Sequence, residues 1–98
     1  METRIQAIHF DITSRLTDFI NRKADRLARH YPAITAVDVT LKVVKPETAL
    51  NKQAILKVTI PAAPDYVADK TADTFEEAVD MCLDALEKPL SKEKGNHK

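Results

Sequence analysis

Apolar and polar positions along the chain predict four strands and two helices. Residues 3–10 have the β-branched, alternating character of a strand. Residues 34–44 and 53–60 alternate strictly between apolar and polar side chains, so each predicts a strand with one buried face. Residues 66–71 predict a shorter fourth strand.

The first predicted helix begins at Ser14, with Thr13 as its N-cap, because a threonine hydroxyl can accept from the first free N–H groups. Pro32 ends this helix, since the residue before a proline is pushed out of the α region. Between these points apolar residues recur at helical spacing, namely Leu16, Phe19, Ile20, Leu27 and Tyr31.

The second predicted helix follows the string TFEE, in which Thr74 and Glu77 have the spacing of a capping box. Pro89 leaves the Ala85 carbonyl without its partner, so we expect a break or kink there. The remaining residues, 91–98, read as a polar tail that frays. The apolar face of this helix comprises Phe75, Ala78, Val79, Cys82, Leu83 and Leu86.

The predicted order is β-α-β-β-β-α. Three strands joined by short loops favour an antiparallel meander, and the helix between the first two strands allows these to pair in parallel. Two amphipathic helices then cover one face of a four-stranded sheet. The fold class is therefore α+β with two layers, formed by a single domain at residues 1–90 and followed by the tail at 91–98.

Composition favours a soluble globular protein, with 44% hydrophobic and 31% charged residues among 98. The single cysteine, Cys82, allows no internal disulfide and suits a reducing compartment. The N-terminal string METRIQAIHF lacks the apolar core of a signal peptide, and no apolar run approaches the roughly 20 residues of a membrane span. We expect a cytoplasmic protein.

Positive charge is concentrated on the first helix, although the whole chain balances 15 Lys and Arg against 15 Asp and Glu. At about 100° per residue, four arginines fall on a narrow arc beside the apolar stripe, with Lys23 at its border. Such an arc can follow a phosphate backbone, because each guanidinium offers a planar fork of donors. We name it the arginine ridge; it comprises Arg15, Arg22, Arg26 and Arg29.

A solvated helix face is the competing interpretation of this charge. Arg22 could pair with Asp18, and Arg29 with Asp25, at the i,i+4 spacing. For the first helix alone this interpretation is favoured, but charges elsewhere shift the balance. Lysines extend from the sheet and the C-terminus, whereas acids gather on the outer face of the second helix, which predicts a basic side and an acidic side. The acids are Glu76, Glu77, Asp80, Asp84 and Glu87.

Several strings in fixed order carry a family resemblance. They are FDIT at 10–13 with Phe19 and the K..RL string at 23–27, LKVVK at 41–45, TFEEAVDMCLDAL at 74–86 and LSKEK at 90–94. Over nearly its whole length the chain resembles the short form of the ribosome hibernation promoting factor family, also called the ribosome-associated inhibitor family.

The resemblance implies a fold related to double-stranded RNA-binding domains, with an added first strand, and no enzymatic activity. It implies binding to 16S rRNA in the decoding region of the small ribosomal subunit, blocking the messenger and transfer RNA sites in stress or stationary phase. Basic residues at the family's positions are Lys23, Arg26, Lys42, Lys45, Lys88, Lys92 and Lys94, and the ridge adds Arg22 and Arg29.

The chain departs from the family's pattern at Ala85 and Pro89, where a basic and a polar residue are common. This lowers the expected share of the second helix in RNA contact. The expected partner is the small ribosomal subunit; we expect no cofactor, no metal, no membrane, no small-molecule substrate and a monomer away from the ribosome. The alternative function is a protein-interaction module that docks a partner through the acidic second helix or a sheet edge.

Overall fold

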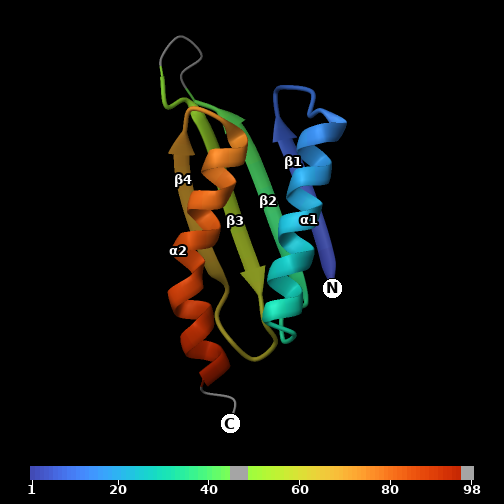
Figure 1. Ribbon diagram of the computed structural model, residues 1–98, viewed down its shortest axis with the longest axis vertical. Coiled ribbons are helices and arrows are strands. Elements are labelled where there is room, and N and C mark those ends of the chain that lie inside the picture. The colour runs from blue at the N-terminus through green and yellow to red at the C-terminus, as the bar shows by residue number, and fades with distance from the viewer. Residues whose placement is uncertain (45–48, 96–98) are drawn as a thin grey trace.

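The computed structural model describes residues 1–44 and 49–95, with side chains described as far as Lys92. Two helices lie side by side on one face of a four-stranded sheet (Figure 1). The predicted element order and fold class are confirmed. The elements are β1 (Glu2–Ile8), α1 (Ser14–His30), β2 (Ala36–Val43), β3 (Lys52–Thr59), β4 (Tyr66–Ala72) and α2 (Phe75–Gly95).

The sheet has the strand order β1-β2-β3-β4. β1 runs parallel to β2, and the other neighbours are antiparallel, as the connections predict. Successive side chains point to opposite faces of the sheet. One cross-strand row, formed by Ile5, Val39, Leu56 and Ala68, faces the helices. The next row, which includes Arg4, Asp38 and Lys57, lies on the uncovered face.

The core fills the space between the helices and the sheet. Leu41 and Val58 are 0% exposed on the sheet side, while Ile20 of α1 and Val79 of α2 are each 1% exposed. Leu83 is only half-buried, although the sequence pattern placed it on the apolar face. The reason is its position at the inner edge of α2, where it faces the space between the two helices.

Both helix starts have the predicted caps. The Thr13 hydroxyl accepts from the Leu16 N–H at 3.1 Å, and the Thr74 hydroxyl accepts from the Glu77 N–H at 3.1 Å. Each bond satisfies one of the backbone donors that a helix leaves free at its first turn.

Of the break or kink expected at Pro89, the break is wrong, because α2 continues through this proline to Gly95. Leu86 and Leu90, on either side of the proline, are 2% and 1% exposed. Their burial holds both turns against the core and outweighs the backbone hydrogen bond that proline removes. Residues 91–95, which the sequence placed in the polar tail, are therefore helical.

Candidate nucleic-acid interface

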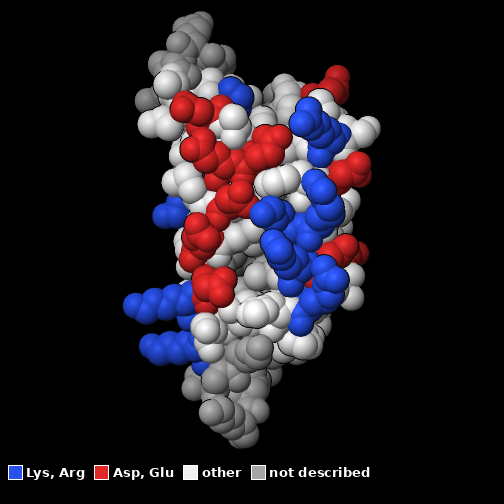
Figure 2. Space-filling view, viewed as in Figure 1, with Lys and Arg blue, Asp and Glu red and all other residues white. Residues whose placement is uncertain are grey.

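The arginine ridge of α1 is exposed along its length. Arg15, Arg22, Arg26 and Arg29 are all exposed, whereas Leu16, Ile20, Ala24 and Leu27 of the same helix are buried. Figure 2 shows the result as a column of Lys and Arg side chains over α1. Burial of the apolar stripe thus fixes which way the arginines point.

The ridge arginines form no close ion pair with the acids on the same helix. In the side chains described, residues 1–44 and 49–92, no ion pair within 4.0 Å involves Arg22, Arg26 or Arg29. The i,i+4 pairs with Asp18 and Asp25 that the sequence allowed are therefore absent from this part of the chain, and the choice between a solvated face and an RNA-binding ridge stays a prediction.

One row of the uncovered face of the sheet provides a contrast, because Arg4 and Lys57 in that row have acidic partners. The guanidinium of Arg4 binds both carboxylate oxygens of Asp38, with 3.0 Å between Nη2 and Oδ2. The Nζ of Lys57 lies 3.9 Å from Oδ2 of Asp65. Positive charge is thus left available to an anionic partner on α1 rather than on the row of the sheet that Arg4 and Lys57 occupy.

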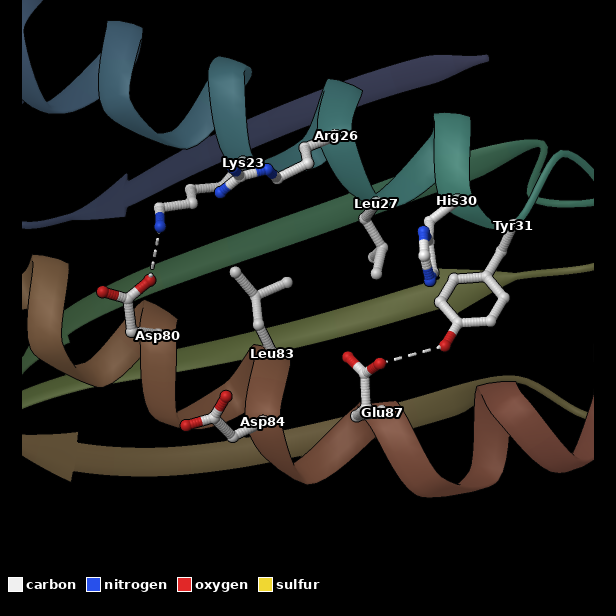
Figure 3. A pocket seen from close by; sticks show the side chains of 9 residues that line it. All are labelled: Lys23, Arg26, Leu27, His30, Tyr31, Asp80, Leu83, Asp84 and Glu87. Atoms are coloured by element: carbon white, nitrogen blue, oxygen red, sulfur yellow. Dashed lines mark hydrogen bonds and ion pairs between the residues drawn. The ribbon is translucent and has the colours of Figure 1, made fainter.

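Lys23 differs from its arginine neighbours because it reaches across to α2. Its Nζ lies 3.2 Å from Oδ1 of Asp80 (Figure 3). The same atom lies 5.3 Å from the centre of the Phe19 ring. The lysine side chain is only 29% exposed. An ion pair and a cation–π contact therefore fix its ammonium group at the inner edge of the ridge.

A groove of about 530 Å³ separates the two helices (Figure 3). The α1 wall is cationic, the α2 wall is anionic, and the base between them is largely apolar. At one end the Tyr31 hydroxyl donates to Oε1 of Glu87 at 3.3 Å, and burial together with the Glu87 charge raises the pKa of Tyr31. The lining residues are Lys23, Arg26 and His30; Asp80, Asp84 and Glu87; and Leu27, Leu83 and Tyr31.

The expectation of separate basic and acidic sides is wrong. Figure 2 shows a column of Asp and Glu side chains over α2 directly beside the column of Lys and Arg side chains over α1, on the same face of the molecule. Asp80 joins the two columns through Lys23. We name the five exposed or half-buried acids of α2 the acidic column: Glu76, Glu77, Asp80, Asp84 and Glu87.

The structure brings together four of the nine predicted RNA-binding residues, Arg22, Lys23, Arg26 and Arg29, on α1. Lys42 is exposed on the uncovered face of the sheet, since it alternates with the buried Leu41. Lys88 and Lys92 are exposed on α2. At about 100° per residue they lie beyond the acidic column as seen from α1.

Lys45 and the side chain of Lys94 lie outside the described residues. RNA contact by any of the nine residues stays a prediction. Sequence reasoning missed Asp80 and Phe19 as partners of Lys23. The i,i+4 spacing of Phe19 and Lys23 was a usable signal, whereas nothing in the sequence pairs a residue of α1 with one of α2.

Chemistry other than binding finds no support in the described residues. No three His, Cys, Asp or Glu side chains among them lie close enough to hold a metal ion. Cys82 is 0% exposed, and burial raises the pKa of its thiol to about 11, so it is a core residue rather than a nucleophile. Neither described helix has the length and apolarity needed to cross a membrane.

The fold and the ridge define a class: a small α+β domain that presents an exposed basic helix. Residues 3–98 match the family described as Sigma 54 modulation protein / S30EA ribosomal protein. The chain is 31% identical to the ribosome hibernation promoting factor of Azotobacter vinelandii over 94 residues, covering 96% of this chain and 83% of the relative. The corresponding protein of Pseudomonas putida is 30% identical, with 96% and 87% covered. The chain belongs to this family, which is not one of enzymes.

Solved structures agree with this fold. A ribosomal subunit interface protein from Coxiella burnetii superposes with a TM-score of 0.83 at 22% identity, covering 97% of this chain and 99% of that one. The N-terminal domain of Thermus thermophilus Protein Y gives 0.74 at 19% identity, covering 91% and 93%. These structures confirm the fold, while the family match over residues 3–98 and the relatives of 30–31% identity confirm the family resemblance that the sequence suggested.

Proposed function

We propose that this protein is a ribosome-associated translation inhibitor. It binds small-subunit rRNA in the decoding region and occupies the space of messenger and transfer RNA in stress or stationary phase. Relatives that are 30–31% identical are named ribosome hibernation promoting factors. The single observation that carries the proposal is the exposed arginine ridge, with which no described acid forms an ion pair within 4.0 Å.

The ridge suits a phosphate backbone in its dimensions. From Arg15 to Arg29 the helix rises by roughly 20 Å, at about 1.5 Å per residue. Guanidinium groups spaced along this length can each form a bidentate bond to phosphate oxygens. Recognition then rests on the shape of the RNA and the spacing of its phosphates, which is how proteins read folded RNA in the absence of unstacked bases.

Aromatic side chains do not offer an alternative mode of binding on this face. Phe19 is half-buried under the Lys23 ammonium, and Tyr31 is 5% exposed with its hydroxyl bonded to Glu87. Single-strand binders gain much of their affinity by stacking bases on aromatic rings, and neither of these rings is available for such stacking. Inhibition would therefore follow from occupancy of the site and not from reading a sequence.

The test is co-sedimentation with purified 30S subunits over a salt series. We expect wild-type binding to weaken steeply as salt rises, since each phosphate contact releases condensed counterions. Arg22→Glu with Arg26→Glu should abolish both sedimentation and translation inhibition in a cell-free assay. Both side chains are exposed, so we expect the variant to fold, and circular dichroism would verify this. Unchanged sedimentation of the folded variant would reject the ridge and favour docking on a protein partner.

A further inference from the structure

The groove between α1 and α2 places an acidic wall beside the surface proposed to bind RNA. Asp80, Asp84 and Glu87 form this wall, and Asp80 holds the Lys23 ammonium at 3.2 Å. Packed helices lie about 8–10 Å apart, which is close to the Debye length of about 8 Å at physiological salt. A phosphate bound on the ridge is therefore close enough to these carboxylates to be repelled by them.

An RNA duplex lying across both helices would meet the two columns differently. Phosphates over α1 would face the arginines, while phosphates over α2 would face the acidic column (Figure 2). A backbone that follows α1 alone would avoid the second contact. The same face thus attracts one path of the RNA backbone and repels another.

We propose that Asp80, Asp84 and Glu87 determine specificity by restricting the ridge to RNA whose backbone follows α1. This inference rests on the proposed function. It implies that the protein prefers a folded ribosomal site to free duplex RNA, which a basic ridge without neighbouring acids would also bind. Asp80 is also a positioning residue, because its carboxylate pairs with the Lys23 ammonium, which also lies over the Phe19 ring, and so competes with phosphate for this ammonium.

The expected size follows from Coulomb's law in water. Two unit charges about 10 Å apart change an affinity by roughly twofold before screening. Three carboxylates near several phosphates therefore give about 3–10-fold discrimination. The effect is modest for each residue and becomes measurable when the three are changed together.

The experiment uses Asp80→Asn, Asp84→Asn and Glu87→Gln in one chain. Affinity is measured for purified 30S subunits and for a random-sequence RNA duplex of about 20 base pairs, over a salt series. We expect the affinity for the duplex to rise about 3–10-fold and the affinity for 30S subunits to rise less. The ratio of 30S affinity to duplex affinity should therefore fall. The duplex salt slope should steepen by about one unit as Lys23 becomes free to contact phosphate.

A matched control carries the same charge change on another surface: Glu2→Gln, Asp65→Asn and Asp69→Asn. Glu2 and Asp69 lie on the uncovered face of the sheet, and Asp65 pairs with Lys57 of that face. We expect this control to leave the affinity ratio close to that of the wild type. An equal gain in duplex binding would overturn the proposal, because net charge alone would explain it.

Two further outcomes are informative. A folded triple variant with an unchanged ratio and slope overturns the inference and leaves the proposed function intact. In the second outcome, the wild-type protein does not bind 30S subunits, but the triple variant still gains more duplex binding than the control. This result contradicts the proposed function instead. Asp80→Asn alone repeats the slope test with an isosteric change at a carboxylate that is 49% exposed, should the triple variant fold poorly.

Discussion

α1 and α2 pack on the same face of the sheet, but their exposed sides carry opposite charges. Each buries an apolar stripe on the face formed by Val39, Leu41 and Leu56. On their exposed sides, α1 carries the arginine ridge and α2 the acidic column. The comparison separates two requirements: the buried stripes set the fold, while the exposed arcs, which are free to vary, set what the surface attracts or repels.

The helices also differ in their response to proline. α1 ends before Pro32, whereas α2 continues through Pro89. The residues that follow explain the difference. Leu90 fills the core after Pro89, whereas Pro32 and Ala33 after α1 are exposed and the chain turns toward β2. Burial of Leu90 at the next helical position therefore accompanies the continuation of α2, whereas burial resumes after Pro32 only at Ile34, outside the helix.

The largest expected effect concerns this last turn. Leu90→Ala should lower the free energy of unfolding by about 2–5 kcal/mol, because it opens a cavity at a site that is 1% exposed. Urea denaturation followed by circular dichroism measures it. The control is Leu50→Ala, the same change at a residue that is 60% exposed, with an expected change within about 0.5 kcal/mol. Equal effects would mean that α2 does not pack beyond Pro89.

Charge reversal on the two helices is the next largest effect. Arg22→Glu with Arg26→Glu and Lys88→Glu with Lys92→Glu are both i,i+4 pairs of exposed residues with the same change in charge. We expect the α1 pair to weaken 30S binding at least about 100-fold, since each change replaces an attraction with a repulsion. The α2 pair lies beyond the acidic column and should weaken it less than about 5-fold. Equal losses would extend the RNA surface across α2.

The sequence was sufficient for the fold because its signals are local. Alternation gave the strands, Thr13 and Thr74 marked the helix starts, and Pro32 marked an end. The error at Pro89 arose because local propensity was weighed without the burial of Leu90, which depends on contact with the sheet. Tertiary packing commonly overrides such propensities.

The site was only half predictable for a related reason. Helical periodicity placed Arg22, Arg26 and Arg29 on one arc without reference to the rest of the chain. The position of that arc relative to the acids of α2 depends on how the two helices pack, which periodicity does not encode. The contact of Lys23 with Asp80, 57 positions later in the chain, could therefore be found only in three dimensions.

A pH effect should distinguish the buried faces of the helices. Burial raises the pKa of Cys82 on α2 from 9.0 to about 11, whereas the buried stripe of α1 holds no thiol. A raised folded-state pKa means that stability is full below about pH 9 and is lost as pH rises toward 11. The loss attributable to this thiol is up to about 2–3 kcal/mol.

Urea unfolding at pH 8 and at pH 10.5 measures this loss. Cys82→Ala serves as the control, because it removes the thiol and leaves the tyrosines, which also titrate in this range, in place. We expect the variant to lose less stability than the wild type between the two pH values. An identical loss in both proteins would show that the thiol does not contribute.

The smallest expected effect tests the contact that joins the two columns. A double-mutant cycle of Lys23→Gln and Asp80→Asn should give a coupling free energy of about 0.2–1 kcal/mol, falling further at 1 M salt. The value is small because water reaches both partners, whose side chains are 29% and 49% exposed. A contact of this size positions Lys23 toward Asp80 without making the pair a rigid link between the helices. Coupling above about 2 kcal/mol would instead make the pair a fixed structural link between α1 and α2, and Lys23 would be withdrawn from the RNA surface.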